Sequence, residues 1–162
     1  MRVRNSLLRC QKERLKMDNR EPITIVLIED SDLDADLTIR ALHQHNFGNQ
    51  IVRLSDGLEA MEYFFPDRKK QTGMEVDKPK LILLDIKLPG INGLEVLKAL
   101  KNDHTTRKYP VVILTSSTED RDIKTCYELG VNSFISKPVE YDSFVETVHT
   151  LGMYWLLMNK AP

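Results

Sequence analysis

The sequence predicts a doubly wound α/β fold with a five-stranded parallel sheet and five helices. Short apolar runs alternate with segments of helical periodicity from about residue 22 to residue 158, and this alternation is typical of right-handed strand–helix–strand units. One run, Leu81–Leu84, contains only apolar residues, which indicates a strand buried on both faces of a parallel sheet. It ends at Asp85, and such sheets place their ligand sites at the carboxyl ends of strands.

The composition is that of one folded domain. The chain has 162 residues, of which 41% are hydrophobic and 29% are charged, and this length supports a single domain with a full core. No apolar run approaches the roughly 20 residues that span a bilayer, so we expect no membrane association. The two cysteines, Cys10 and Cys126, lack metal-binding partners or spacing. We therefore expect a reduced, cytoplasmic protein.

Residues 1–20 differ in charge from the rest of the chain. They hold seven basic and two acidic residues, whereas residues 21–162 hold 16 basic and 22 acidic residues. We expect a dispensable, disordered basic extension at 1–20 ahead of a domain at 21–162. Two other interpretations stay open: the extension binds nucleic acid or another anionic surface, or translation starts at Met17.

The first half of the domain contains three predicted strands and two predicted helices. Strands are expected at 23–28, 50–54 and 81–84, because each is a short apolar or β-branched run beside turn residues. Ser31 or Asp32 is expected to cap the first helix, and the second helix follows Gly57. Residues 66–79 are largely polar and are expected to form an inserted loop.

The second half continues the alternation. A third helix is expected at 94–102 and a fourth strand at 111–114. Ser117 or Thr118 is expected to cap the fourth helix, and Gly130 to end it. A short fifth strand at 133–136 precedes Lys137 and Pro138, and the last helix runs from Asp142 onward.

Acidic, hydroxyl and basic side chains follow four of the five predicted strands. Because the carboxyl ends of parallel strands share one edge, we expect these side chains to converge: Glu29, Asp30, Asp85, Thr115 and Lys137. Three acids at one edge repel one another and need a cation, and hard oxygen ligands in an open cluster suit Mg²⁺. The sequence therefore predicts a magnesium site.

The same five residues suggest phosphoryl chemistry. With Mg²⁺ and Lys137 drawing charge away, ionised Asp85 can attack phosphorus and keep the phosphoryl group. Thr115 is then placed to hydrogen-bond the phosphoryl oxygens, and Lys137 to pair with them. Each residue also has a structural alternative: the acidic pair could cap the first helix, Thr115 could be a strand-end hydroxyl, and Lys137 could be a surface lysine.

These motifs resemble the receiver domain of two-component response regulators over about residues 23–157. The family has an acidic pair after the first strand, the acceptor Asp after the third, Ser or Thr after the fourth, and Lys-Pro after the fifth. The resemblance implies a flavodoxin-like fold and a stand-alone phospho-acceptor in a two-component phosphorelay. Asp85 would accept its phosphoryl group from a histidine kinase and switch a protein-interaction surface. A receiver that binds partners without phosphorylation is the alternative.

The resemblance also implies individual roles. Asp30 would bind the metal directly, Glu29 would act partly through water, and the main-chain carbonyl of Lys87 would complete the protein ligands together with Asp85. Phe134 matches the aromatic switch position that moves with Thr115, although simple core packing is an equal alternative. In this family the Lys-Pro bond is usually cis, an isomer that costs only about 0.5–1 kcal/mol.

A looser resemblance indicates a subgroup. The sequence 114–117, the Lys-Pro-Val-Glu stretch, the loop before the third strand and Tyr154-Trp155 are similar to single-domain regulators that partner phytochrome-type histidine kinases. A rival function is an aspartyl-nucleophile phosphohydrolase. Such enzymes place a second acid two residues after the nucleophile, and Lys87 stands there instead, so we expect no enzyme.

The last predicted helix carries more apolar surface than one core face can bury. An apolar stripe runs along it and consists of Phe144, Val148, Leu151, Trp155 and Met158. Residues 153–158 are in addition apolar on every face. We expect a homodimer through this end, the alternative being that the segment folds back on its own domain. About 25 residues follow the fifth strand, too few for a helix-turn-helix module, so we expect no direct DNA binding.

Overall fold

The structure, a computed structural model, describes residues 24–44, 50–66 and 78–159. The basic extension at 1–20 and most of the inserted loop lie outside these ranges. Among the helices of the described part, none is long and apolar enough to cross a membrane.

Five parallel strands form one sheet in the order β2-β1-β3-β4-β5. The strands are β1 (Thr24–Ile28), β2 (Gln50–Leu54), β3 (Leu81–Leu84), β4 (Val111–Thr115) and β5 (Ser133–Ser136). β1 and β3 are neighbours although β2 lies between them in the sequence, so the direction of winding reverses at this pair. Ile28 and Leu84 are the last paired residues at the carboxyl ends of β1 and β3. The doubly wound fold is thereby confirmed, with its switch point at the ends of β1 and β3.

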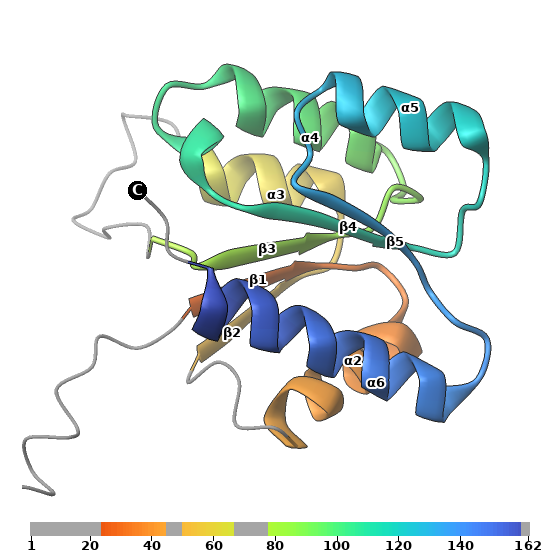
Figure 1. Ribbon diagram of the computed structural model, residues 1–162. Helices are drawn as coiled ribbons and strands as arrows, with labels where there is room; N and C mark the ends of the chain where they lie inside the picture. The colour runs from red at the N-terminus through yellow and green to blue at the C-terminus, as the bar shows by residue number, and fades with distance from the viewer. Residues whose placement is uncertain (1–23, 45–49, 67–77, 160–162) are drawn as a thin grey trace, which may run out of the picture.

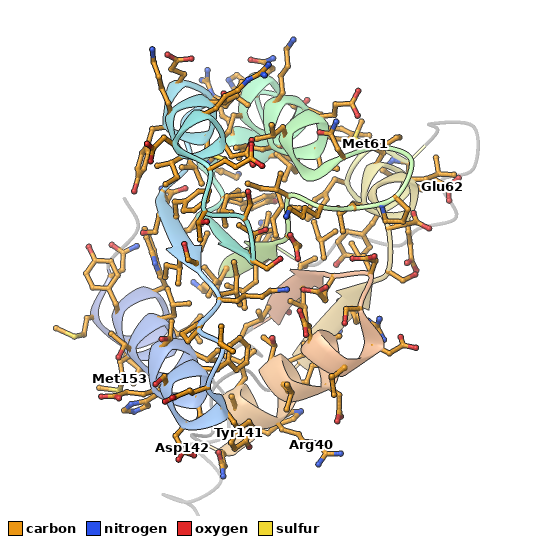
Figure 2. The ribbon with its side chains drawn as sticks, turned by 90° about the vertical axis from the view of Figure 1, so that its right-hand side faces the viewer. Arg40, Met61, Glu62, Tyr141, Asp142 and Met153 are labelled. Carbon is orange, nitrogen blue, oxygen red and sulfur yellow. The ribbon has the colours of Figure 1, made fainter. Side chains whose placement is uncertain are left out.

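Helices cover both faces of the sheet (Figure 1). One face carries α2 (Asp32–Gln44) and α6 (Tyr141–Gly152), and the other carries α3 (Gly57–Phe64), α4 (Gly93–Asn102) and α5 (Asp120–Glu128). Figure 2 shows the same layers from the side, with Arg40 and Tyr141 below the sheet and Met61 above it. A 3₁₀ turn, η2 (Thr106–Lys108), precedes β4, and a π-helical segment, η3 (Met153–Met158), extends α6.

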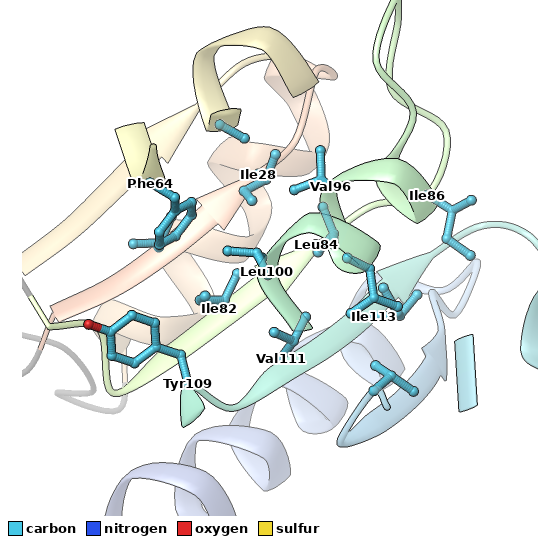
Figure 3. Packing of buried hydrophobic residues seen from close by; sticks show 14 of the residues in the cluster. Ile28, Phe64, Ile82, Leu84, Ile86, Val96, Leu100, Tyr109, Val111 and Ile113 are labelled. Carbon is cyan, nitrogen blue, oxygen red and sulfur yellow. The ribbon is translucent and has the colours of Figure 1, made fainter. Parts of the chain in front are cut away.

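The core consists of one apolar cluster on each face of the sheet. Side chains alternate along each strand, so Ile82 and Leu84 join the cluster under α3, α4 and α5, while Leu81 and Leu83 join the cluster over α2 and α6. All four are fully buried, as the sequence predicts for this run. Figure 3 shows the first cluster, in which Phe64 packs above the strands. Apolar packing on both faces therefore fixes the position of Asp85, which follows β3.

The helix ends agree only partly with the predicted caps. Ser31 Oγ accepts a hydrogen bond from the N–H of Asp34, as expected for the cap of α2. The prediction for α5 is wrong: Glu119 occupies its cap position without a side-chain hydrogen bond, and Ser117 Oγ instead donates to Asp122 Oδ2 at 2.7 Å. Gly130 ends α5 with a φ of 87°, a conformation that favours glycine.

Candidate functional site: an acidic cluster around Lys137

The acceptor candidate Asp85 lies one residue beyond β3 and is 5% exposed. Its N–H donates to the carbonyl of Ile28 at 3.0 Å, which ties it to the end of β1. Gly93, the first residue of α4, allows this helix to lie close to the backbone of Asp85, because a Cβ at position 93 would overlap the carbonyl oxygen of Asp85. The two neighbouring strands and α4 therefore hold the carboxylate at the edge of the sheet.

Both carboxylate oxygens of Asp85 accept hydrogen bonds. Oδ1 accepts from the hydroxyl of Thr115 at 2.6 Å and from the N–H of Lys87 at 2.9 Å. Oδ2 accepts from the ammonium of Lys137 at 2.9 Å. Thr115 is the last residue of β4 and is fully buried, and Lys137 follows β5. The strand ends thus bring together the three residues predicted to carry the chemistry.

Lys137 contacts three carboxylates rather than one. Its Nζ lies 2.5 Å from Glu29 Oε2, 2.8 Å from Asp34 Oδ2 and 2.9 Å from Asp85 Oδ2. The side chain of Lys137 is 7% exposed, and those of Glu29 and Asp85 are 2% and 6% exposed. An ammonium this deeply buried needs such partners, because removing an ion from water is costly.

The pKa values follow from burial and from these contacts. Burial raises the pKa of Glu29 above its ordinary 4.5, against the opposing effect of Lys137. Burial also acts to raise the pKa of Asp85, but hydrogen bonds from Thr115, Lys137 and the Lys87 N–H outweigh it and lower that pKa. For Lys137, burial is outweighed by Asp34, Glu29 and Asp85, and the pKa is raised. Asp85 is therefore ionised at neutral pH, as a nucleophile must be.

Two predicted site residues have exposed side chains. Asp30 is exposed, and its carbonyl accepts a hydrogen bond from Arg53 at 3.4 Å. The side chain of Lys87 is exposed, and its contact with Asp85 is made by the main-chain N–H. The Lys137–Pro138 bond is trans, since the described residues contain no cis peptide bond; the cis form implied by the resemblance is not found here.

The donor set suits a divalent cation, although the described residues form no group of three or more metal-ligating side chains in binding geometry. Glu29, Asp34 and Asp85 converge on the single positive charge of Lys137, and the exposed Asp30 is the next residue after Glu29. This acidic cluster therefore carries excess negative charge on hard oxygen atoms, which Mg²⁺ and similar ions prefer.

The structure adds Asp34 and Ser117 to the residues expected from the sequence. Asp34, in the first turn of α2, is the third partner of Lys137. Buried Ser117 donates its N–H to Thr115 Oγ1 at 3.3 Å and its hydroxyl to Asp122, which links Thr115 to α5. Phe134 lies on β5, is half-buried and packs against the cluster under α4 and α5. Asp34 is one of three acidic residues near the start of α2, with Asp32 and Asp36, so no sequence signal distinguished it.

Most of the chain is similar to known proteins. Residues 25–149 match the response regulator receiver domain. The chain is 35% identical over 146 residues to the probable methanogenesis regulatory protein FilR2 of Methanothrix harundinacea, covering 90% of this chain and 92% of that protein. It is 32% identical over 139 residues to response regulator Rcp1 of Synechocystis sp., and the match covers 86% of this chain and 92% of that protein.

Solved structures show the same likeness. The phosphorylated cyanobacterial phytochrome response regulator RcpA matches with a TM-score of 0.80 and 33% identity, over 88% of this chain and 99% of that one. The Mn²⁺-bound form of Rcp1 matches with a TM-score of 0.78 and 32% identity, over 87% of this chain and 99% of that one. The chain therefore belongs to the response regulator receiver domain family and is related to the phytochrome response regulator RcpA.

Proposed function

We propose that this protein is a phospho-acceptor switch in which Asp85 receives a phosphoryl group from a histidine kinase in the presence of Mg²⁺. The observation that carries the proposal is the setting of Asp85: a buried, ionised carboxylate at the carboxyl edge of β3, bound by Thr115, Lys137 and a main-chain N–H. These donors are the groups that stabilise charge on a transferring phosphoryl group.

In the proposed transfer, an oxygen of Asp85 attacks the phosphorus of a phosphohistidine. The new phosphorus–oxygen bond forms as the phosphorus–nitrogen bond breaks, and the imidazole nitrogen keeps the electron pair of that bond. The ammonium of Lys137 neutralises charge on the phosphoryl oxygens, and the hydroxyl of Thr115 donates to one of them. Mg²⁺, held by Asp30, Asp85 and the Lys87 carbonyl with Glu29 acting partly through water, would offset the remaining negative charge.

The switch is proposed to run from Thr115 toward α5 and β5. A phosphoryl group on Asp85 adds negatively charged acceptor oxygens beyond the carboxylate that Thr115 now contacts, and we propose that the hydroxyl of Thr115 moves toward them. Ser117 connects Thr115 to Asp122 of α5, and Phe134 packs beneath the same helix. We propose that Thr115 and Phe134 move together and alter the surface of α5, β5 and α6.

The proposed kinase is of the phytochrome type. Support comes from RcpA, which is named as a phytochrome response regulator and matches 88% of this chain.

The proposed location is the cytoplasm, supported by the free, buried thiol of Cys126. Residues 1–20 are proposed to be an extension separate from the receiver domain at 21–162, on the basis of their opposite charge.

The partner proposed for the carboxyl-terminal segment is a second copy of this chain. Trp155 and Leu156 pack against the core cluster over α2 and α6, whereas Tyr154, Leu157 and Met158 are 51%, 59% and 67% exposed. A groove of about 490 Å³ between edge strand β5 and α6 adjoins this segment and includes Tyr154 and Trp155 in its lining. Exposed apolar side chains beside an edge strand favour self-association.

Intact mass spectrometry after incubation with acetyl phosphate tests the proposal. We expect one added phosphoryl group in the presence of Mg²⁺, none with excess chelator, and none on Asp85→Asn. Asp56→Asn, which changes an acid that caps α3, serves as the matched control and should be labelled like the wild type. Undiminished labelling of Asp85→Asn would contradict the proposal, and steady turnover of p-nitrophenyl phosphate would favour the phosphohydrolase instead.

A further inference from the structure

We propose that Asp34 is a positioning residue that holds the ammonium of Lys137 in the resting state and thereby opposes occupation of Asp85 by a phosphoryl group. The inference rests on the proposed function of Asp85 and assigns a role to a residue that the predicted site did not include. Asp34 acts through Lys137, with which it forms a 2.8 Å ion pair.

The place of Asp34 is fixed by the first turn of α2. Its N–H donates to Ser31 Oγ at 3.3 Å, and its carbonyl accepts from the hydroxyl of fully buried Thr38 at 2.8 Å. Its carboxylate therefore reaches Lys137 from α2, the helix that follows β1. No other acid of α2 contacts Lys137: Asp36 pairs with Arg40 and Asp32 pairs with Arg53.

The three carboxylates around Lys137 differ in exposure. Asp34 is 35% exposed, whereas Glu29 and Asp85 are 2% and 6% exposed. When a phosphoryl group on Asp85 recruits the ammonium, one existing partner must give way, and the one that water can solvate gives way at the lowest cost. Asp34 is that partner. Its ion pair with Lys137 is thus made in the resting state and weakened in the phosphorylated state.

A contact made in only one of two states shifts the equilibrium toward that state. Asp34 and Asp85 also share the ammonium of Lys137, so the negative charge of Asp34 lies close to the carboxylate that accepts the phosphoryl group, and like charges repel. Both effects have the same sign, so removing the charge of Asp34 should favour the phosphorylated form.

Trifluoroberyllate, a phosphoryl mimic that binds carboxylates reversibly, allows this equilibrium to be measured. We would titrate it at saturating Mg²⁺ and follow the bound fluorine signals by ¹⁹F NMR. Asp34→Asn should bind about threefold more tightly than the wild type, the size expected for loss of a partly exposed ion pair. Asp36→Asn removes the same charge from the same helix and should bind like the wild type, while Asp34→Glu, which restores the carboxylate, should return the affinity toward that of the wild type.

The outcomes separate this inference from the proposed function. Equal or weaker binding by Asp34→Asn, with wild-type binding intact, would overturn the role of Asp34 alone. Binding by Asp85→Asn as strong as that of the wild type, or no binding by the wild type, would overturn the proposed function and this inference with it. Thermal unfolding of Asp34→Asn beside Asp36→Asn verifies that both variants are folded at the titration temperature.

Discussion

The hydroxyl of Thr115 donates a 2.6 Å hydrogen bond to Oδ1 of Asp85, and both side chains are buried. Thr115 is the last residue of β4, Asp85 directly follows the last residue of β3, and these two strands pair in parallel. Their contact therefore depends directly on the register of the sheet. It also supplies part of the stabilisation that keeps Asp85 ionised despite burial.

Replacing Thr115 by Val keeps the shape of the side chain and removes the donor. Because the acceptor is a buried carboxylate, we expect the free energy of unfolding at neutral pH to fall by about 1.5–3 kcal/mol. The pKa of Asp85 is lowered in the folded protein, so its contribution to stability exists above the ordinary pKa and is lost as the pH falls through the folded value. The loss caused by Thr115→Val should therefore shrink in acid.

Urea unfolding at several pH values measures this effect. Thr115→Ser retains the hydroxyl and should keep the pH dependence of the wild type, apart from a constant cost for the lost methyl group. A cost for Thr115→Val that does not vary with pH would contradict the assigned hydrogen bond.

Glu29→Gln tests the opposite pKa shift. Because the folded protein holds the proton of Glu29 more tightly than the unfolded chain, the stability contributed by Glu29 is present below its ordinary pKa of 4.5 and is lost as the pH rises through the folded value. Gln does not titrate. The unfolding free energy of the variant, relative to that of the wild type, should therefore increase as the pH rises above 4.5 toward neutral pH.

The same substitution should weaken the binding of Mg²⁺, since it removes one negative charge from the acidic cluster around Lys137. Isothermal titration with Mg²⁺ at neutral pH measures this loss. A stability difference that stays flat or reverses between acid and neutral pH would show that Glu29 is not held with a raised pKa.

Gly93→Ala should disturb the site through the backbone. The added Cβ would overlap the carbonyl oxygen of Asp85, so α4 or the loop before it must shift, at a cost of about 1–3 kcal/mol. Lys98→Ala, an exposed change in the same helix, should stay within about 0.5 kcal/mol. Urea unfolding compares the two variants, and equal stability of both would refute the close approach.

Leu157→Glu tests the proposed dimer. Leu157 in η3 is 59% exposed and Leu58 in α3 is 57% exposed, so Leu58→Glu is a matched control on the other face of the sheet. Burying a leucine is worth about 1.5–3 kcal/mol, and we expect Leu157→Glu to weaken self-association at least about tenfold. Analytical ultracentrifugation gives the two dissociation constants. Equal effects of the two variants, or a monomeric wild type at high concentration, would argue against this interface.

The fold could be predicted because its signals are local. Leu81–Leu84 is a short apolar run with turn residues around it, and few structures other than a buried parallel strand accommodate it. The cap of α5 could not be predicted in this way. Ser117 and Thr118 both have cap-forming side chains, and the choice was decided by the contact of Ser117 with Asp122, which depends on how the chain leaves β4.

The site was predictable where residues end strands and less so where they lie on helices. Asp85, Thr115 and Lys137 meet because parallel strands share an edge. Asp34 is one of several acids at the start of α2, and its partner Lys137 is 103 positions away. Only the rotation of α2 about its axis distinguishes Asp34 from Asp32 and Asp36. The exposed position of Asp30 likewise follows from the path of the loop after β1.

The most direct test of the central claim is to identify the carboxylate that carries the phosphoryl group. The protein would be incubated with acetyl phosphate and Mg²⁺ and then reduced with borohydride, which converts an aspartyl phosphate into homoserine. Peptide mass mapping then shows which position has changed. Homoserine is expected at position 85 alone, and only when Mg²⁺ is present. Homoserine at position 30 or 34, or conversion without Mg²⁺, would contradict the central claim.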